Sequence, residues 1–175
     1  MSEFLGLIIE DDPSLAEKPV SPKSLVDDVA AQVDILARAK GLTFKAEIAD
    51  DMPDTIVGDR YWLRQIMMNL VSNAIKFTDR GVVSLNLLRE DENWLIQVTD
   101  TGAGIPEDAR DRIFSAFEQG SNGYVGSTQG AGLGLSIVKE MSSLMDGNID
   151  LDSVMGSGTI FTVTLPLHVV ESEAV

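Results

Sequence analysis

Two asparagines and a lysine stand at helical spacing in the stretch DRYWLRQIMMNLVSNAIKF, residues 59–77. Asn69, Asn73 and Lys76 lie four and three residues apart, so they share one face of the helix that this stretch predicts. Each asparagine inside a helix costs a few tenths of a kcal/mol against better helix formers, a cost that a binding role would offset. Two amides and an ammonium group on one face can hold a cation and a phosphate together. The alternative is an ordinary solvated polar face.

An aspartate followed by two glycines ends the predicted strand NWLIQVTD. Asp100 follows the alternation of this strand, so its carboxylate is expected to face the interior. A buried carboxylate needs hydrogen-bond donors, and the exocyclic amino group of adenine is one. Gly102 and Gly104 would let a flat ring approach the backbone closely. The competing interpretation is a turn carboxylate that caps its own loop.

Two further glycine clusters follow. GAGLG, residues 130–134, directly precedes a predicted helix, where free backbone amides and the helix dipole favour phosphate. The cluster is not a P-loop, because no Lys-Ser/Thr follows, and it is not a dinucleotide fingerprint, because no strand feeds it. A flexible linker is the alternative. GSGT, residues 156–159, is by itself a hairpin turn, and Phe114 and Phe117 are expected to be core residues under the glycine-rich loop.

The elements that must position these groups alternate irregularly along the chain. Asp59 is the expected N-cap of the central helix, and Ser24 is the expected N-cap of an earlier helix that runs to Lys40. Further helices are predicted at EDARDRIF and LSIVKEMSSLM, and strands at LTFKAEIA, TIV, VVSLNLLRE, NWLIQVTD, GNIDLDS and TIFTVTLPL. This order predicts an antiparallel or mixed sheet with helices on one face, and it disfavours a doubly wound nucleotide fold.

Composition narrows the possible functions. The 175 residues are enough for one well-buried domain, and no apolar run is long enough for a membrane span. The absence of cysteine excludes thiolate metal sites and fits a cytoplasmic protein, and one histidine, His168, excludes a multi-histidine site. A formal charge of −15 disfavours binding to nucleic acid or anionic lipid. A polyphosphate site in this chain would need backbone amides, Lys76 and a divalent cation to supply positive potential.

Five motifs, read in order, resemble a known domain. NLVSNAIKFT, DTGAGIP, FSAFEQG, GAGLGLSIVKEM and GSGTIFTVTLPL resemble the N, G1, F, G2 and G3 boxes of the ATP-binding catalytic domain of sensor histidine kinases. The wider family includes Hsp90, DNA gyrase and MutL. The resemblance covers roughly residues 20–167 and implies a Bergerat-type α/β (α+β) two-layer sandwich. Its mixed, largely antiparallel sheet would have about five strands, with three main helices on one face.

The resemblance also implies a division of the chain and its cofactors. Residues 1–22 would be the end of a dimerisation helix and a linker, residues 23–167 the catalytic domain, and residues 168–175 a frayed tail. ATP and Mg²⁺ would be the cofactors. Asn73 would be the metal ligand through its side-chain carbonyl, a donor that suits a hard cation. Asn69 would lie close to it, and Lys76 would contact phosphate oxygens.

The same resemblance implies the remaining nucleotide contacts. Asp100 would accept a hydrogen bond from the adenine amino group, and Thr159 would support it through water. The glycines of residues 130–134 would lie against the phosphates, and residues 118–133 would form a lid. The full set of implied nucleotide-binding residues is Asn69, Asn73, Lys76, Phe77, Asp100, Gly102, Gly104, Ile105, Gly130, Gly132, Leu133, Gly134 and Thr159.

Such kinases transfer the γ-phosphoryl group of ATP to a histidine on a separate dimerisation domain, and from there to an aspartate of a response regulator. The implied partners are therefore ATP, the dimerisation domain of the same kinase and a receiver domain. The full-length protein would be a homodimer, and a membrane anchor is compatible with the resemblance. This fragment would be a cytoplasmic monomer without direct membrane contact.

Two departures from the family pattern qualify this interpretation. The phosphoacceptor helix is missing, and His168 lies outside any such motif. No basic residue occurs from Glu118 to Ser136, where many relatives carry one in the lid. A nucleotide-binding pseudokinase without phosphotransfer is therefore the alternative. A hydrolase is disfavoured, because an amide, Asn69, occupies the position of the water-activating glutamate of related ATPases.

Overall fold

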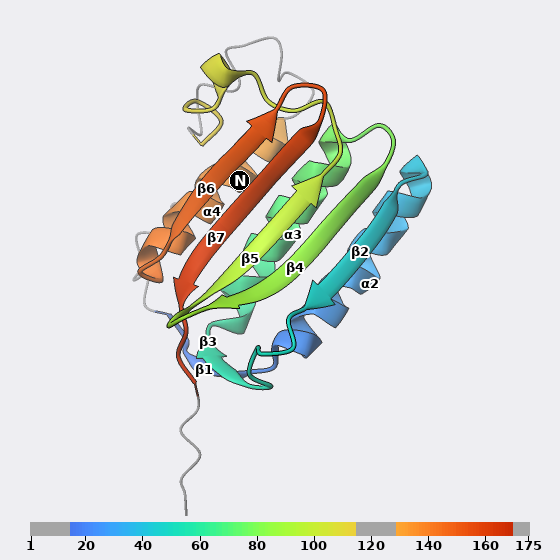
Figure 1. Cartoon of the computed structure of the whole chain (residues 1–175). Helices are drawn as coiled ribbons and strands as arrows, with labels where there is room; N and C mark the ends of the chain where they lie inside the picture. Colours follow the sequence, from blue (N-terminus) through green and yellow to red (C-terminus); the bar gives the residue numbers. More distant parts are fainter. Residues whose placement is uncertain (1–14, 115–128, 170–175) are drawn as a thin grey trace, which may run out of the picture.

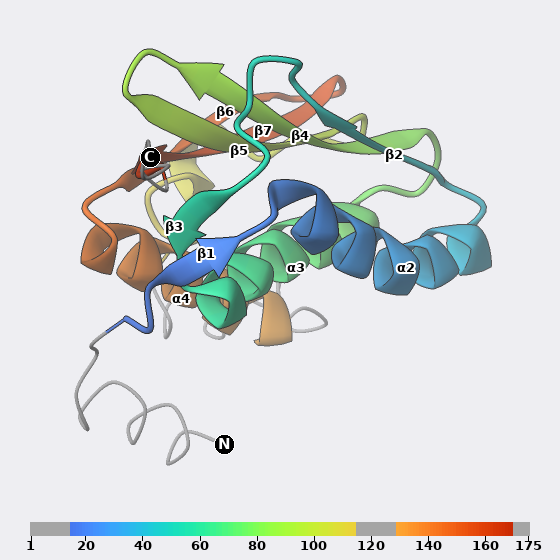
Figure 2. The same cartoon turned by 90° about the horizontal axis from the view of Figure 1, so that it is seen from below.

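The protein is described by a computed structural model that covers residues 15–114 and 129–169, with only the backbone described for residues 129–133. A five-stranded sheet forms one layer, and three α-helices in the described part of the chain form the other (Figure 1). Seen along the layers, all three helices cover the same face of the sheet (Figure 2). This arrangement confirms the predicted two-layer sandwich.

The sheet is mixed, with the strand order β2-β4-β5-β7-β6. The strands are β2 (Thr43–Ile48), β4 (Val82–Glu90), β5 (Asn93–Asp100), β6 (Asn148–Val154) and β7 (Gly158–Pro166). Only β2 and β4 pair in parallel, whereas the other three pairs are antiparallel. Each predicted strand of the main sheet is therefore confirmed, with ends that shift by a residue or two.

Alternation in the central strands builds the core. In β4, β5 and β7 every second residue is buried against the helices, and the residues between them are half-buried on the open face. The buried strand residues are Val83, Leu85, Leu87, Trp94, Ile96, Val98, Phe161, Val163 and Leu165. At about 25 cal/mol per Å² of apolar surface, this burial is the main favourable contribution to folding.

The helices are α2 (Pro22–Lys40), α3 (Arg60–Phe77) and α4 (Gln129–Leu144), with α3 packed between the other two. Asp59 caps α3 as predicted, because its side chain accepts a hydrogen bond from the Trp62 amide. The predicted cap of α2 is wrong, since Ser21 performs this role and accepts from the amide of Ser24. Proline fits the first position of a helix, so Pro22 lets α2 begin earlier than expected.

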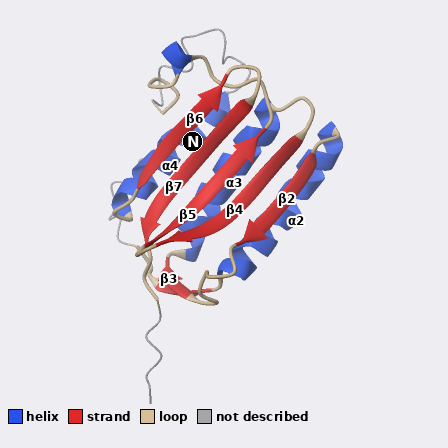
Figure 3. Cartoon of the chain, in the orientation of Figure 1, coloured by secondary structure: helices blue, strands red, loops and turns tan. Residues whose placement is uncertain are grey.

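Two other helix predictions differ from the structure. EDARDRIF forms one turn of 3₁₀ helix, η1 (Glu107–Ala109), followed by turns (Figure 3). α4 begins at Gln129, six residues before the predicted start, so the glycine cluster at residues 130–134 lies in its first turns. The alternative of a flexible linker is therefore wrong for these residues.

A second, two-stranded sheet lies at the end of the molecule remote from η1 (Figure 1). It pairs β1 (Lys18–Val20) with β3 (Ile56–Gly58), so part of the expected linker is a strand. The carbonyl of His168 accepts from the Val57 amide at 2.7 Å, and Val169 bridges to Ile56, so the first two residues of the expected tail are paired. Residues 1–14, Phe117 and residues 170–175 lie outside the described residues.

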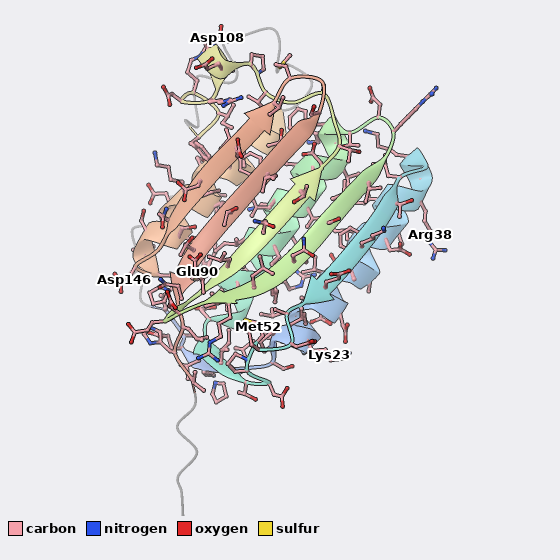
Figure 4. All side chains as sticks on the ribbon, viewed as in Figure 1. Lys23, Arg38, Met52, Glu90, Asp108 and Asp146 are labelled. Atoms are coloured by element: carbon pink, nitrogen blue, oxygen red, sulfur yellow. The ribbon has the colours of Figure 1, made fainter. Side chains whose placement is uncertain are left out.

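Three labelled acidic residues mark the two ends of the molecule. Asp108 marks the end that carries η1, and Glu90 and Asp146 mark the opposite end (Figure 4). Across the residues that the structure describes, no helix combines the length and the apolar composition needed to cross a bilayer.

Candidate functional site

The polar face of α3 contains a buried amide without a partner. Asn73 is 5% exposed, and its Nδ2 has no hydrogen-bond acceptor among the described residues. A buried N–H without an acceptor costs about 1–3 kcal/mol, so buried amides in native proteins are normally paired. Asn69 is half-buried on the same face, and Lys76 is exposed near the end of the helix. Of these three side chains, Asn73 is therefore the one with a buried N–H group that needs a polar ligand.

The first turns of α4 lie beside this polar face. A Cβ added to Gly134 would come 3.5 Å from Cγ of Asn69 and 3.6 Å from its Oδ1. The first four N–H groups of any α-helix have no partner within the helix. α4 begins at Gln129, and its second turn lies against Asn69 at Gly134. The side chain of Leu133 and the surroundings of Gly130 and Gly132 lie outside the described part.

Asp100 ends β5 with its side chain facing the helices. It is 7% exposed, and Oδ1 accepts from the Gly102 amide at 2.8 Å. Burial raises the pKa of Asp100, and hydrogen bonds from the backbone of Gly102 and Thr159 partly oppose this rise. The carboxylate is therefore buried as predicted, and it also caps its own loop as the competing interpretation held.

The end of α3 meets Asp100 at Gly102. A Cβ on Gly102 would lie 2.7 Å from the carbonyl oxygen of Phe77, and 3.0 Å from both Oδ1 of Asp100 and Oγ1 of Thr78. Only glycine fits so close to a backbone carbonyl. Phe77 is 41% exposed at this junction, and Thr78 is fully buried with its hydroxyl unpaired among the described residues. Sequence reasoning missed Thr78, although a hydroxyl directly after the helix was a visible signal.

The loop after Asp100 is bound to the turn between β6 and β7. The Gly156 amide donates to the Ala103 carbonyl, and the Ile105 amide donates to Oγ of Ser153, each at 2.8 Å. Gly104 has a φ of 82°, and a Cβ there would come 2.5 Å from the Val154 carbonyl oxygen. Gly102 and Gly104 are therefore both required by the close approach of the chain's own backbone, whereas the approach of a flat ring to them stays a prediction.

Three buried polar residues form a row across three strands. Asp100 of β5 pairs with Thr159 of β7, and Thr159 pairs with Ser153 of β6. All three are at most 7% exposed, and Oγ of Ser153 lies 2.9 Å from Oγ1 of Thr159. Sequence reasoning missed Ser153, because its contacts depend on the register of β6 against β7.

The structure thus brings most of the predicted site residues together around the C-terminal half of α3. Contacts or register connect Asn69 with Gly134, Gly102 with Phe77, and Asp100 with Thr159. Asn73 and Lys76 follow Asn69 along the same helix. Phe114 packs edge to face on Phe161 with ring centroids 6.2 Å apart, as a core residue should, and Nζ of Lys139 lies 5.8 Å from its ring. The FSAFEQG segment after Phe114 and most of the lid lie outside the described residues.

The side chains on the polar face of α3 fit Mg²⁺ bound together with phosphate. No group of three or more His, Cys, Asp or Glu side chains in the described ranges is arranged to hold a metal by itself. Mg²⁺ commonly takes one or two protein oxygens and completes its shell with water and substrate phosphates. The carbonyl oxygen of Asn73 has the chemistry of such a ligand, and the unpaired Nδ2 beside it can donate to water or phosphate.

The chain is similar in sequence to one section of larger bacterial sensor proteins. The chain is 40% identical to the sensor histidine kinase RcsC of Escherichia coli K12 over 148 residues, 85% of this chain and 16% of RcsC. It is 41% identical to the sensory/regulatory protein RpfC of Xanthomonas campestris pv. campestris over 141 residues, 77% of this chain and 19% of RpfC. The chain therefore spans less than a fifth of either relative.

Solved structures share the fold. Full-length ShkA in complex with AMPPNP aligns with a TM-score of 0.80 and 35% identity, covering 91% of this chain and 33% of ShkA. The nucleotide-free catalytic domain of the histidine kinase ThkA aligns with a TM-score of 0.73 and 26% identity, covering 87% of this chain and 98% of that domain. The family model for histidine kinase-, DNA gyrase B- and HSP90-like ATPases matches residues 58–169, from the end of β3 to three residues beyond β7. The chain belongs to this ATPase family.

Proposed function

We propose that this domain binds Mg²⁺-ATP and positions its γ-phosphoryl group for transfer to a histidine on a separate dimerisation domain. The observation that carries the proposal is that Gly134 of α4 lies beside Asn69, while Gly102, two residues after Asp100, lies against Phe77 at the end of the same helix α3. RcsC, of which this chain resembles one section, is a sensor histidine kinase, and ShkA was solved with AMPPNP.

At the base end of the site, Asp100 accepts from the exocyclic amino group of adenine. Thr159 supports this contact through water, and Gly102, Gly104, Ile105 and Phe77 line the base pocket. Gly102 and Gly104 fix the loop that borders the pocket, because a side chain at either position would collide with the carbonyl of Phe77 or of Val154.

At the phosphate end, Asn73 holds Mg²⁺ through its amide oxygen and Lys76 contacts phosphate oxygens. Gly130, Gly132, Leu133 and Gly134 place the first amides of α4 against the phosphates. When bound, Mg²⁺ bridges phosphate oxygens and neutralises their charge, which an acidic domain needs. Asn69 is the third polar residue of this face, and as an amide it cannot act as a base, so the site favours transfer over hydrolysis.

Two further protein domains would act with this one, a dimerisation domain that carries the histidine and a receiver domain. The chemistry of such a site is positioning and charge neutralisation, so the histidine must be presented by another domain. A receiver domain would then take the phosphoryl group. Use of ATP as a substrate suits a cytoplasmic location, and the division into residues 1–22, 23–167 and 168–175 remains a prediction.

Asn73→Ala tests the metal assignment. The variant should abolish Mg²⁺-dependent binding of an ATP analogue in calorimetry, while the thermal midpoint stays close to that of the wild type. Ser72→Ala is a control at the neighbouring residue, because its hydroxyl bonds to the backbone carbonyl of Asn69, three residues earlier in α3. Unchanged affinity in Asn73→Ala would reject the assignment.

A mixing experiment separates transfer from binding alone. The domain is combined with its own dimerisation domain and ATP labelled at the γ-phosphate, and label on the histidine is measured. Binding of the nucleotide without label would favour the pseudokinase, which is motivated by the absence of basic residues from Glu118 to Ser136. Steady ATP turnover by the isolated domain would instead indicate a hydrolase.

A further inference from the structure

We propose that Ser153 is a positioning residue that fixes the direction of the Thr159 hydroxyl proton, and thereby makes the base pocket selective for purines with an amino group at C6. The proposal rests on the proposed function, because it assumes that a purine lies against Asp100 and Thr159. Ser153 lies one strand further from the base than Thr159, so it would act through Thr159.

Hydrogen-bond arithmetic at Ser153 fixes the protons. A serine hydroxyl has one proton and two acceptor sites. Oγ of Ser153 lies 3.0 Å from the Gly158 carbonyl oxygen, and a carbonyl can only accept, so the Ser153 proton is donated there. The Ile105 amide donates to the same Oγ at 2.8 Å. One acceptor site then remains on Ser153.

Thr159 must therefore act as the donor in its contact with Ser153. Their oxygens are 2.9 Å apart, and the single proton of Ser153 is already used. If Ser153 donated to Thr159 instead, its oxygen would face the Gly158 carbonyl oxygen at 3.0 Å with no proton between them. The Thr159 proton consequently points toward β6, and the lone pairs of Thr159 are left for the side of Asp100.

This arrangement gives the base pocket one polarity. The Asp100 carboxylate accepts hydrogen bonds, and Thr159 presents only lone pairs beside it. An amino group at C6, and a water bridged to it, can donate to both. A carbonyl at C6 would place an acceptor against two acceptors, which leaves buried polar groups unpaired. The row Asp100–Thr159–Ser153 therefore rejects oxo purines.

Removal of the Ser153 hydroxyl should relax this selection. In Ser153→Ala the Thr159 hydroxyl loses its acceptor on β6 and is free to turn its proton toward the base. A carbonyl at C6 then finds a donor. The discrimination between the two purines should weaken, whereas a purely structural loss would weaken the binding of both nucleotides alike.

Calorimetry with ADP and inosine diphosphate, each with Mg²⁺, measures the effect. In the wild type ADP should bind more tightly, and in Ser153→Ala the ratio of the two dissociation constants should fall by about tenfold. Ser153→Thr keeps the hydroxyl and should keep the wild-type ratio. Ser142→Ala is a matched control, since it removes another buried hydroxyl, one bonded within α4 to the Val138 carbonyl.

The outcomes separate the two proposals. A wild type that binds neither nucleotide, or both equally, would refute the adenine site itself. A wild type that discriminates, together with an unchanged ratio in Ser153→Ala, would overturn the role of Ser153 alone. A double-mutant cycle adds a second measurement: in a Thr159→Val background Ser153→Ala should no longer change the ratio, and a change that persisted would contradict action through Thr159.

Discussion

Asp100 combines a proposed role in adenine binding with a cost to stability. Its carboxylate is buried at the end of β5, and burial raises its pKa from the ordinary value of 3.8 despite the hydrogen bonds from Gly102 and Thr159. The folded chain therefore holds this proton more tightly than the unfolded chain does. Below the unfolded pKa both states are protonated and no penalty exists. As pH rises through the folded pKa, the ionised form becomes costly to keep buried.

Asp100→Asn should therefore stabilise the protein near neutral pH while it weakens adenine binding. Asparagine keeps the oxygen that accepts from Gly102 and removes the buried charge. The gain in the free energy of unfolding should be full above the folded pKa and should vanish below the unfolded one. Thermal denaturation of both proteins from acid to neutral pH measures it. A gain that is the same at every pH would contradict a charge effect.

The burial and the local hydrogen bonds of a residue were predictable where the sequence pattern of its own segment determines them. Alternation in β5 predicts that Asp100 is buried, and the Asp-x-Gly pattern predicts that it caps its own loop. Thr78 and Ser153 could not be found in the same way. The surroundings of Thr78 depend on where the end of α3 meets Gly102, and those of Ser153 depend on strand register, and neither is encoded by local periodicity.

At the scale of elements, the start of α3 is held by a cap with two functions. Asp59 is buried, and its oxygens accept from the Trp62 amide at 3.2 Å and from the Ala16 amide at 2.8 Å. The first bond satisfies a free N–H of the helix, and the second ties the segment before β1 to it. The helix that carries Asn69 and Asn73 is therefore fixed at the end away from the site.

Asp59→Ala should cost more stability than Ser21→Ala, which removes the cap of α2 alone. We expect a loss of about 2 kcal/mol for Asp59→Ala and about 1 kcal/mol for Ser21→Ala in the free energy of unfolding. Urea denaturation of both variants provides the comparison. Equal losses would show that the bond to Ala16 contributes nothing.

Helix boundaries were harder to predict than helices. The start of α2 was missed because the prediction rested on Ser24 and left out Ser21 and Pro22, which cap the helix and occupy its first position. The start of α4 was missed because six of the fifteen residues from Gly120 to Gly134 are glycine, a composition that favours a loop. Packing explains the outcome, since the buried stripe of Leu135, Val138 and Met141 stabilises the helix well beyond what local propensity allows.

At the scale of the whole molecule, β3 joins both ends of the described chain. One side of it pairs with β1, and Ile56 and Val57 also contact residues 168 and 169. The mixed sheet and its helices were predictable from the order of the motifs. The small sheet was predictable only in part: TIV predicted β3, whereas β1 is too short to show periodicity, and no local pattern indicates that these two strands pair.

A chain that ends at Leu167 should therefore be less stable than one that ends at Val169. The shorter chain loses the bond from the Val57 amide to the His168 carbonyl and the bridge between Ile56 and Val169. We expect its thermal midpoint to fall by about 3–6 °C, as for the loss of roughly one to two backbone hydrogen bonds in a protein of this size. Scanning calorimetry of the two chains measures this difference, and equal thermal midpoints would contradict the prediction.

The position of β3 has a mechanical consequence. Tension applied between Leu15 and Val169 would load the short ladders on β3 before it reached the five-stranded sheet. Those contacts would yield first, and they lie at the end of the molecule remote from η1 and the β6–β7 turn (Figure 1). The row of Asp100, Thr159 and Ser153 would keep its geometry while the contacts of β3 with β1 and with Val169 broke.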